Sequence, residues 1–201
     1  MRQLLRNVLG LLLLYSFIPL NAQINRSLSE NDKRVLEDQA QAKVMSFQKF
    51  CASIGNKSIN KTEKSQLIRT ALQLFSDENR IIQVSNLNGT VSKKKVSVYL
   101  ERLSMLGYQR IQIDSYDCRI AKHFELSKEM NEKYPGEEWY EGIATVIQRF
   151  RGERGDFVYE DLVERRFKVY VQKKEVFERG KKSERWIIRL GDISVTTLSN
   201  T

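Results

Sequence analysis

The spacing of apolar residues changes once along this chain, near Gly107. Before Gly107 apolar residues recur every three or four positions, which is the period of an α-helix. After it they recur at every second position, which is the period of a β-strand. Helices at one end of a chain and strands at the other are typical of an α+β fold, not of alternating βαβ units. We therefore expect N-terminal helices packed on a strongly curved antiparallel sheet.

The first helix is expected to begin after Ser29, a good N-cap residue, and to stop at Gly55. Its apolar seam follows the helical period and comprises Leu36, Ala40, Val44, Phe47, Cys51 and Ile54. A helix seam and a one-sided sheet must bury each other. We therefore expect the seam to pack against apolar residues of the last strands, namely Phe167, Val169, Trp186 and Ile188.

Two further helices are expected before Gly107. The second begins at Asn60, with Glu63 placed as in a capping box. The third spans residues 92–106. Between them, residues 80–86 read as a short strand, and Asn88-Gly89 is a turn signal.

Four strands are expected in the second half of the chain, at residues 108–119, 139–151, 159–175 and 185–198. Residues 121–136 suit either a loop or a loop with one helical turn. In the last strand the apolar phase slips by one residue between Leu190 and Ile193. A slip of this kind at a glycine predicts a β-bulge at Gly191.

This order of elements resembles the NTF2-like (cystatin-like) superfamily, in which a strongly bent sheet wraps a long N-terminal helix. The resemblance rests also on the stretch Tyr99-Leu100-Glu101-Arg102-Leu103 and on the bulged last strand at residues 186–195. It implies a cone-shaped pocket between helices and sheet, and a homodimer formed through the outer face of the sheet. It implies no particular activity, since the superfamily contains enzymes, transport factors and assembly proteins.

Residues 1–22 have the pattern of a signal peptide. Arg2 and Arg6 precede an apolar run at residues 8–18, and Pro19 ends the run. We expect cleavage after Ala22 and one domain at residues 23–201; an uncleaved anchor is the alternative. No second apolar run approaches the length of a membrane span. The product is therefore expected to be periplasmic or secreted, and not an integral membrane protein after cleavage.

The residue inventory excludes several kinds of chemistry. The chain has one His and two Cys, so catalytic or metal schemes that need two His and Cys-rich zinc modules are ruled out. Phosphate-binding, dinucleotide-binding and nucleophile-elbow motifs are absent from the sequence. We therefore expect neither a cofactor nor a metal. An oxidising compartment would permit a Cys51–Cys118 disulfide, and two unpaired thiols are the alternative.

Three polar residues fall on strand phases that also carry core residues: Asp117, Asp161 and Arg165. Each lies either at a strand end in water or on the wall of a pocket. In a pocket, Asp161 would be a candidate base and Arg165 an anchor for an anion. At a strand end in water, these three residues would have no chemical role.

Positive charge gathers near the end of the chain. The chain has a formal net charge of +9, and residues 165–189 contain ten Lys or Arg against three Glu. The candidate basic surface around the last hairpin comprises Lys168, Lys173, Lys174, Lys181, Lys182 and Arg185. An export signal disfavours nucleic acid as its partner, so anionic envelope surfaces or an acidic protein are the expected partners. The alternative is that these lysines protect a strand edge from aggregation.

Two functions remain open from the sequence. One is a non-catalytic envelope protein that binds a partner or ligand through its cone or its basic hairpin. The other is a small secreted or periplasmic enzyme, of isomerase or hydrolase type, that uses an inward carboxylate. The absence of an acid–base pair at a recognisable spacing favours the first.

Overall fold

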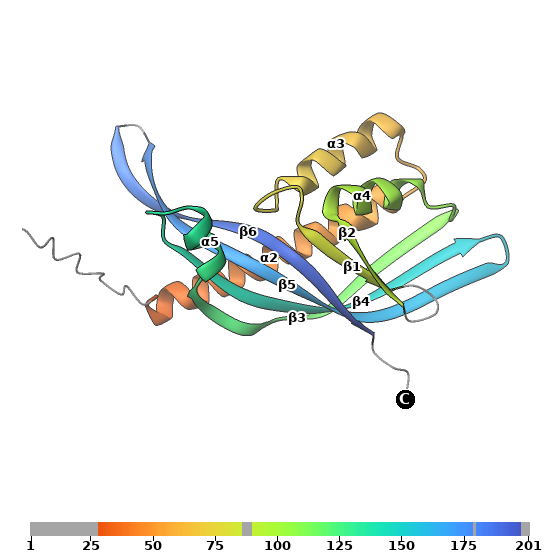
Figure 1. Ribbon diagram of the computed structural model, residues 1–201. Helices are drawn as coiled ribbons and strands as arrows, with labels where there is room; N and C mark the ends of the chain where they lie inside the picture. Colours follow the sequence, from red (N-terminus) through yellow and green to blue (C-terminus); the bar gives the residue numbers. More distant parts are fainter. Residues whose placement is uncertain (1–27, 86–89, 179, 198–201) are drawn as a thin grey trace, which may run out of the picture.

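The computed structural model describes residues 28–85, 90–178 and 180–197, which form an α+β fold. Its helices are α2 (Glu30–Gly55), α3 (Lys61–Leu72), α4 (Val96–Met105) and α5 (Lys128–Lys133). Its strands are β1 (Ile81–Ser85), β2 (Val91–Lys95), β3 (Arg110–Leu126), β4 (Trp139–Arg154), β5 (Phe157–Glu178) and β6 (Lys181–Thr197). The N-terminal helices pack on the sheet, as the change of apolar spacing predicts (Figure 1).

Helix α2 begins and ends where its sequence predicts. Ser29 caps it by accepting a hydrogen bond from the backbone N–H of Asp32 at 3.1 Å. All six seam residues are buried. At Gly55 the helix comes so close to the sheet that an added Cβ would lie 3.1 Å from the side chain of Ile111. A larger residue there would require the Ile111 side chain to shift by a few tenths of an ångström.

Helices α3 and α4 give one confirmed prediction and one correction. Asn60 caps α3 through a 2.9 Å hydrogen bond from the Glu63 N–H. The helix expected at residues 92–106 begins only at Val96, because Val91–Lys95 forms β2 and pairs with β1. Strand β2 exposes most of its side chains, so it has no alternation of apolar residues to reveal it.

The sheet has the strand order β2-β1-β6-β5-β4-β3 and is open, with β2 and β3 at its edges. Strands β3 to β6 form the expected antiparallel meander. The sheet is mixed, however, and the expectation of a wholly antiparallel sheet was wrong in this respect. Strand β1 lies parallel to β6 and pairs with it through Ile82 and Ile193. The short strand expected at residues 80–86 has no pattern that shows its direction in the sheet.

One hydrophobic cluster joins α2 to the sheet and contains the residues predicted to meet there. The Phe47 ring lies edge-on to Phe75, with centroids 5.1 Å apart, and to Phe167, with centroids 6.0 Å apart. Val169 and Ile188 are buried in the same cluster, and Trp186 packs against it. The predicted packing of the helix seam on the last strands is confirmed.

The predicted bulge in β6 is also present. Phe167 pairs with Ile193 and Val169 pairs with Leu190, so Gly191 and Asp192 together face Lys168 of β5. This extra residue lets both Leu190 and Ile193 enter the core. It also turns Asp192 toward β1, where its carboxylate accepts a 2.8 Å hydrogen bond from the Ile81 N–H.

The ambiguous segment at residues 121–136 divides into strand and helix. Strand β3 continues to Leu126, and its register shifts hide it by breaking the alternation of side chains. Helix α5 then packs on the face of the sheet opposite α2 (Figure 1), where Met130, Trp139 and Tyr170 form a second small cluster. The sheet is therefore partly covered on both faces.

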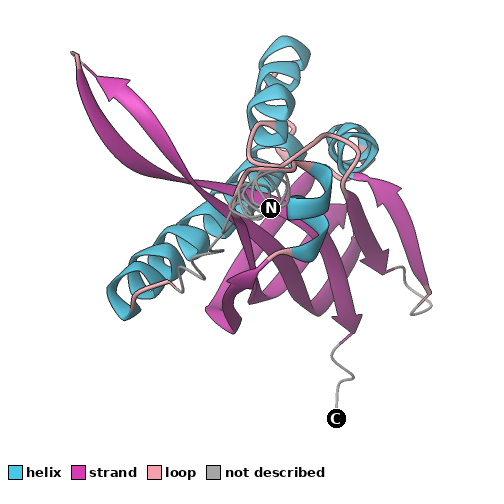
Figure 2. Ribbon diagram, turned by 60° about the vertical axis from the view of Figure 1, so that its left-hand side comes forward, coloured by secondary structure: helices cyan, strands magenta, loops and turns pink. Residues whose placement is uncertain are grey.

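The long strands extend beyond the helices. The hairpin of β5 and β6 stands away from the body of the molecule (Figure 2). Within the described residues, none of the helices combines the length and apolar character needed to cross a lipid bilayer. The predicted signal peptide and the Asn88-Gly89 turn lie outside those residues.

Candidate functional site

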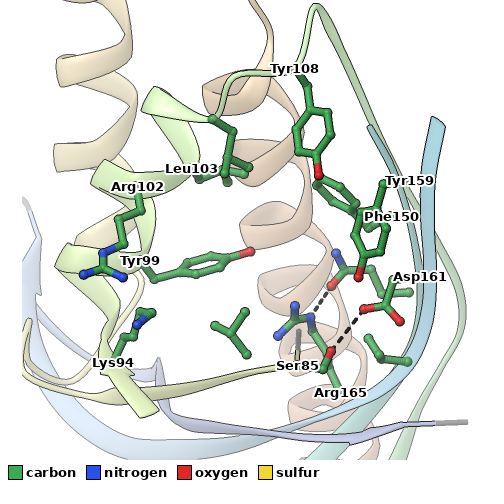
Figure 3. A pocket seen from close by; sticks show the side chains of 14 residues that line it. Ser85, Lys94, Tyr99, Arg102, Leu103, Tyr108, Phe150, Tyr159, Asp161 and Arg165 are labelled. Atoms are coloured by element: carbon green, nitrogen blue, oxygen red, sulfur yellow. Dashed lines mark hydrogen bonds between the residues drawn. The ribbon is translucent and has the colours of Figure 1, made fainter. Parts of the chain in front are cut away.

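A cavity of about 300 Å³ lies between α4, the β1–β2 hairpin and the ladder of β4 and β5 (Figure 3). Part of its wall is apolar or aromatic: Val84, Leu103, Leu106, Val163, Phe150, Tyr99, Tyr108 and Tyr159. The remainder is polar or charged: Ser85, Lys94, Arg102, Gln148, Asp161 and Arg165. Ligand sites typically combine an apolar wall with a few placed polar groups, so this cavity is the candidate site.

The period of each element explains which side chains reach the cavity. On β5 every second residue faces it, beginning at Tyr159 and ending at Arg165. On β4, Gln148 pairs with Val163 and Phe150 pairs with Asp161, which makes the ladder one wall. Helix α4 supplies the opposite wall from residues spaced three or four apart.

Arg165 is the most deeply buried charge in this cavity, with 7% of its surface exposed. Its Nε donates to the side-chain oxygen of Gln148, and its Nη1 donates to the Gln83 carbonyl at 3.3 Å. Neither partner is charged, and no ion pair joins Arg165 to another residue in the described part of the chain. A buried cation without a counterion is costly, so this guanidinium is well placed to receive an anion.

Asp161 is the carboxylate among the described lining residues. It accepts a 3.0 Å hydrogen bond from the Ser85 hydroxyl, and Tyr159 lies on the same wall of the cavity. Burial raises the pKa of Tyr159 to about 12, and the negative charge of Asp161 acts in the same direction. Tyr159 therefore remains a neutral hydrogen-bond donor at physiological pH.

Tyr99 connects the cavity to the core. Burial raises the pKa values of its hydroxyl and of the Cys51 thiol, that of Cys51 to about 12. Cys51 is thus a protonated thiol and a poor nucleophile. Cys51 and Cys118 are both free in this structure. Cys118 is partly buried against the core, because the register of β3 shifts between Tyr116 and Arg119.

The structure brings two of the three candidate pocket residues together and leaves the third apart. Asp161 and Arg165 line the cavity. Asp117 is exposed on β3 and pairs with Arg119 at 3.0 Å. Its φ of 47° marks the bulge there, which explains why a simple alternation places it incorrectly.

Sequence reasoning missed most of the cavity wall. Tyr159 and Val163 could have been found by extending the phase of Asp161 along β5. The residues of α4 and of the β1–β2 hairpin could not have been found in this way, because they lie far from β5 in the sequence. Only the tertiary fold places them opposite β5.

The basic hairpin is partly neutralised by its own acidic residues. Lys173 pairs with Glu184, and Lys182 pairs with Glu175 at 2.6 Å. Lys168 belongs to a different group, since it pairs with Glu129 of α5 at 3.2 Å. Lys174 and Lys181 are exposed and lie outside these ion pairs, and Arg185 is exposed as well.

Comparisons with known proteins add no relative. No family model matches this chain, and neither a curated protein nor a solved structure matches it. Across residues 28–85, 90–178 and 180–197, no three His, Cys, Asp or Glu side chains gather as a metal site would require. The site's own geometry therefore carries the functional argument.

Proposed function

We propose that this chain is an exported, non-catalytic protein that binds a small ligand in the cavity between α4, the β1–β2 hairpin and the β4–β5 ladder. In this proposal the cavity corresponds to the cone of an NTF2-like fold. The observation that carries it is the buried Arg165, which lines a partly apolar cavity and has only neutral hydrogen-bond partners. A polar group held in this way is typical of ligand pockets.

Binding is tested with N-phenyl-1-naphthylamine, an uncharged dye whose fluorescence rises in apolar surroundings. The protein should bind it saturably with one site per chain. Leu106→Trp, which fills the cavity, should abolish that binding. Leu162→Trp is the matched control, because Leu162 is exposed and does not line the cavity. Dye binding that is absent, or equal in the wild type and Leu106→Trp, would contradict the proposal.

An enzyme of isomerase or hydrolase type is the second candidate. The observation that favours it is the presence of the Asp161 carboxylate on the cavity wall, beside the Tyr159 hydroxyl. Such an enzyme would depend on this single carboxylate and on phenols for proton transfer. Turnover of a cavity-bound compound that Asp161→Asn abolishes, with dye binding intact, would support the enzyme.

Export is tested independently of binding. Protein purified from its native host should begin at Gln23 when its N-terminus is sequenced. A product that retains Met1 would contradict cleavage of the predicted signal peptide.

A further inference from the structure

We infer that the cavity selects a small monocarboxylic acid with an apolar body, whose carboxylate is bound by the Arg165 guanidinium. This inference rests on the proposed binding function and adds the chemical class of the ligand. Three features support this class of ligand: the free donor of Arg165, the charges around it and the size of the cavity.

Arg165 has hydrogen-bonding capacity left over. Of its nitrogens, Nε and Nη1 already donate to Gln148 and to the Gln83 carbonyl, whereas Nη2 donates to no acceptor in the described part of the chain. The guanidinium points into the cavity (Figure 3). Its planar set of donors matches the two oxygens of a carboxylate. A bound carboxylate would supply the counterion that the neutral partners do not.

The remaining charges also favour an anion. Lys94 and Arg102 line the same cavity and form no ion pair with a described residue. With Arg165 they outnumber Asp161, the single carboxylate among the described lining residues, which accepts a hydrogen bond from Ser85. The excess of cations favours an anion, and the apolar part of the wall favours an apolar body over a second charged group. A single carboxylate on an apolar body therefore matches the cavity.

The apolar wall and the volume set the ligand's size. Leu103, Leu106 and Val163 offer surface to an apolar body, and the rings of Tyr108 and Phe150 lie 5.9 Å apart, centroid to centroid. A volume of about 300 Å³ corresponds to about ten water molecules in the liquid. A compact acid with one ring or a short chain fits this space.

The test compares 3-phenylpropanoate with 3-phenylpropanamide, which have the same shape and differ in charge. Each is titrated at pH 7 against the complex of the full chain with N-phenyl-1-naphthylamine. The acid should displace the dye at a concentration roughly tenfold or more below that of the amide, because a charged hydrogen bond is stronger than a neutral one. Arg165→Gln should remove this preference, so that the acid and the amide displace the dye at similar concentrations.

The outcomes separate this inference from the proposed function. If the dye binds but acid and amide displace it equally, or neither does, the carboxylate inference is overturned and the binding function stands. If the dye does not bind, the function itself fails.

Arg165 also holds β1 to the sheet, so Arg165→Gln has a folding risk. Should that variant unfold, the double variant Lys94→Gln/Arg102→Gln decides. If this double variant still prefers the acid to the amide, Arg165 is the residue that binds the carboxylate. If the double variant has lost that preference, the assignment to Arg165 is overturned.

Discussion

Phe47 lies where helix α2 meets the sheet, and its ring is 1% exposed. Phe75 and Phe167 both present their rings to it edge-on. Removing the ring would leave a cavity that neighbours such as Phe75 and Phe167 would have to fill. The packing of this one residue therefore reports on the whole contact between helix and sheet.

Phe47→Ala should lower the free energy of unfolding by about 3–5 kcal/mol, since it loses both buried apolar surface and packing. Chemical denaturation monitored by circular dichroism measures this loss. Lys49→Ala, an exposed position on the same helix, is the control and should change stability little. A loss below about 1 kcal/mol for Phe47→Ala would show that Phe47 is not a core residue.

The surroundings of Glu129 strongly change the ionisation of its carboxyl group. Burial alone would raise the pKa of this carboxyl, but hydrogen bonds from Tyr170, Arg80 and Lys168 outweigh burial and lower the pKa to about 2. Tyr170 and Arg80 each donate at 2.6 Å. The ionised carboxylate therefore ties α5 to the sheet.

Glu129→Gln should destabilise the protein at pH 7 by about 1–2 kcal/mol. This figure is discounted for solvent screening because the side chain is 41% exposed. A lowered pKa stabilises the fold above the ordinary carboxyl pKa of 4.5, and this contribution is lost as pH falls toward 2. Denaturation at pH 7 and at pH 2.5 should show the difference between variant and wild type shrinking in acid. Glu132→Gln, an exposed change on the same helix, should show no such trend.

At the scale of elements, the bulge in β6 affects packing on both faces of the sheet. It directs Leu190 and Ile193 into the core and brings Gly191 against Tyr170. Gly191 faces the ring of Tyr170, and a Cβ built at Gly191 would lie 2.5 Å from that ring. Tyr170 is fully buried and is held by its bond to Glu129, so it has little room to move. The bulge therefore needs a residue without a side chain.

Gly191→Ala should cost about 1–3 kcal/mol of stability, as overpacking does in well-packed cores. Thermal unfolding measures it. Gly107→Ala is the matched control, because the nearest atom to its added Cβ is the tip of Arg154 at 3.8 Å. Equal melting temperatures for the two variants would contradict a tight contact at the bulge.

The projecting hairpin has two unpaired strand edges. Pairing of β5 with β4 stops at Gln172, and the described pairing of β6 with β1 involves Ile193 alone. Residues 173–178 and 181–186 therefore pair only with each other in the described part of the sheet. Edges of this kind invite aggregation, and lysines are a common protection.

Edge protection predicts that Lys174→Val/Lys181→Val aggregates, whereas Lys174→Glu/Lys181→Glu stays monomeric, because either sign of charge protects an edge. Light scattering distinguishes the two variants.

Binding of the hairpin to an anionic surface predicts a different result. The wild type should then sediment with anionic vesicles and release as salt rises, and the Glu variant should not sediment. Vesicle binding lost in the Glu variant would favour the binding surface over edge protection.

For the molecule as a whole, periodicity predicts the elements better than it predicts their assembly. Helix α2 could be placed to the residue, because its seam has one buried face and clear caps. Strand β2 and the end of β3 could not be placed from the sequence. The exposure of β2 and the bulges of β3 remove the alternation of apolar and polar side chains. In the cavity, Asp161 and Arg165 share a strand phase that the sequence shows. Their opposite wall depends on long-range packing that no local pattern records.

The packing of α2 on the last strands also determines when the fold can form. Phe47 near the start of the described chain meets Phe167 far along it, and Leu190 and Ile193 complete the same core. Such contacts form only after long loops have closed. The chain therefore loses conformational entropy before it gains the stabilisation of buried apolar surface. Refolding should therefore take milliseconds to seconds, not microseconds, in stopped-flow fluorescence of Trp186 and Trp139. Because β6 supplies Leu190 and Ile193, the core around Phe47 cannot be completed until the last strand is available.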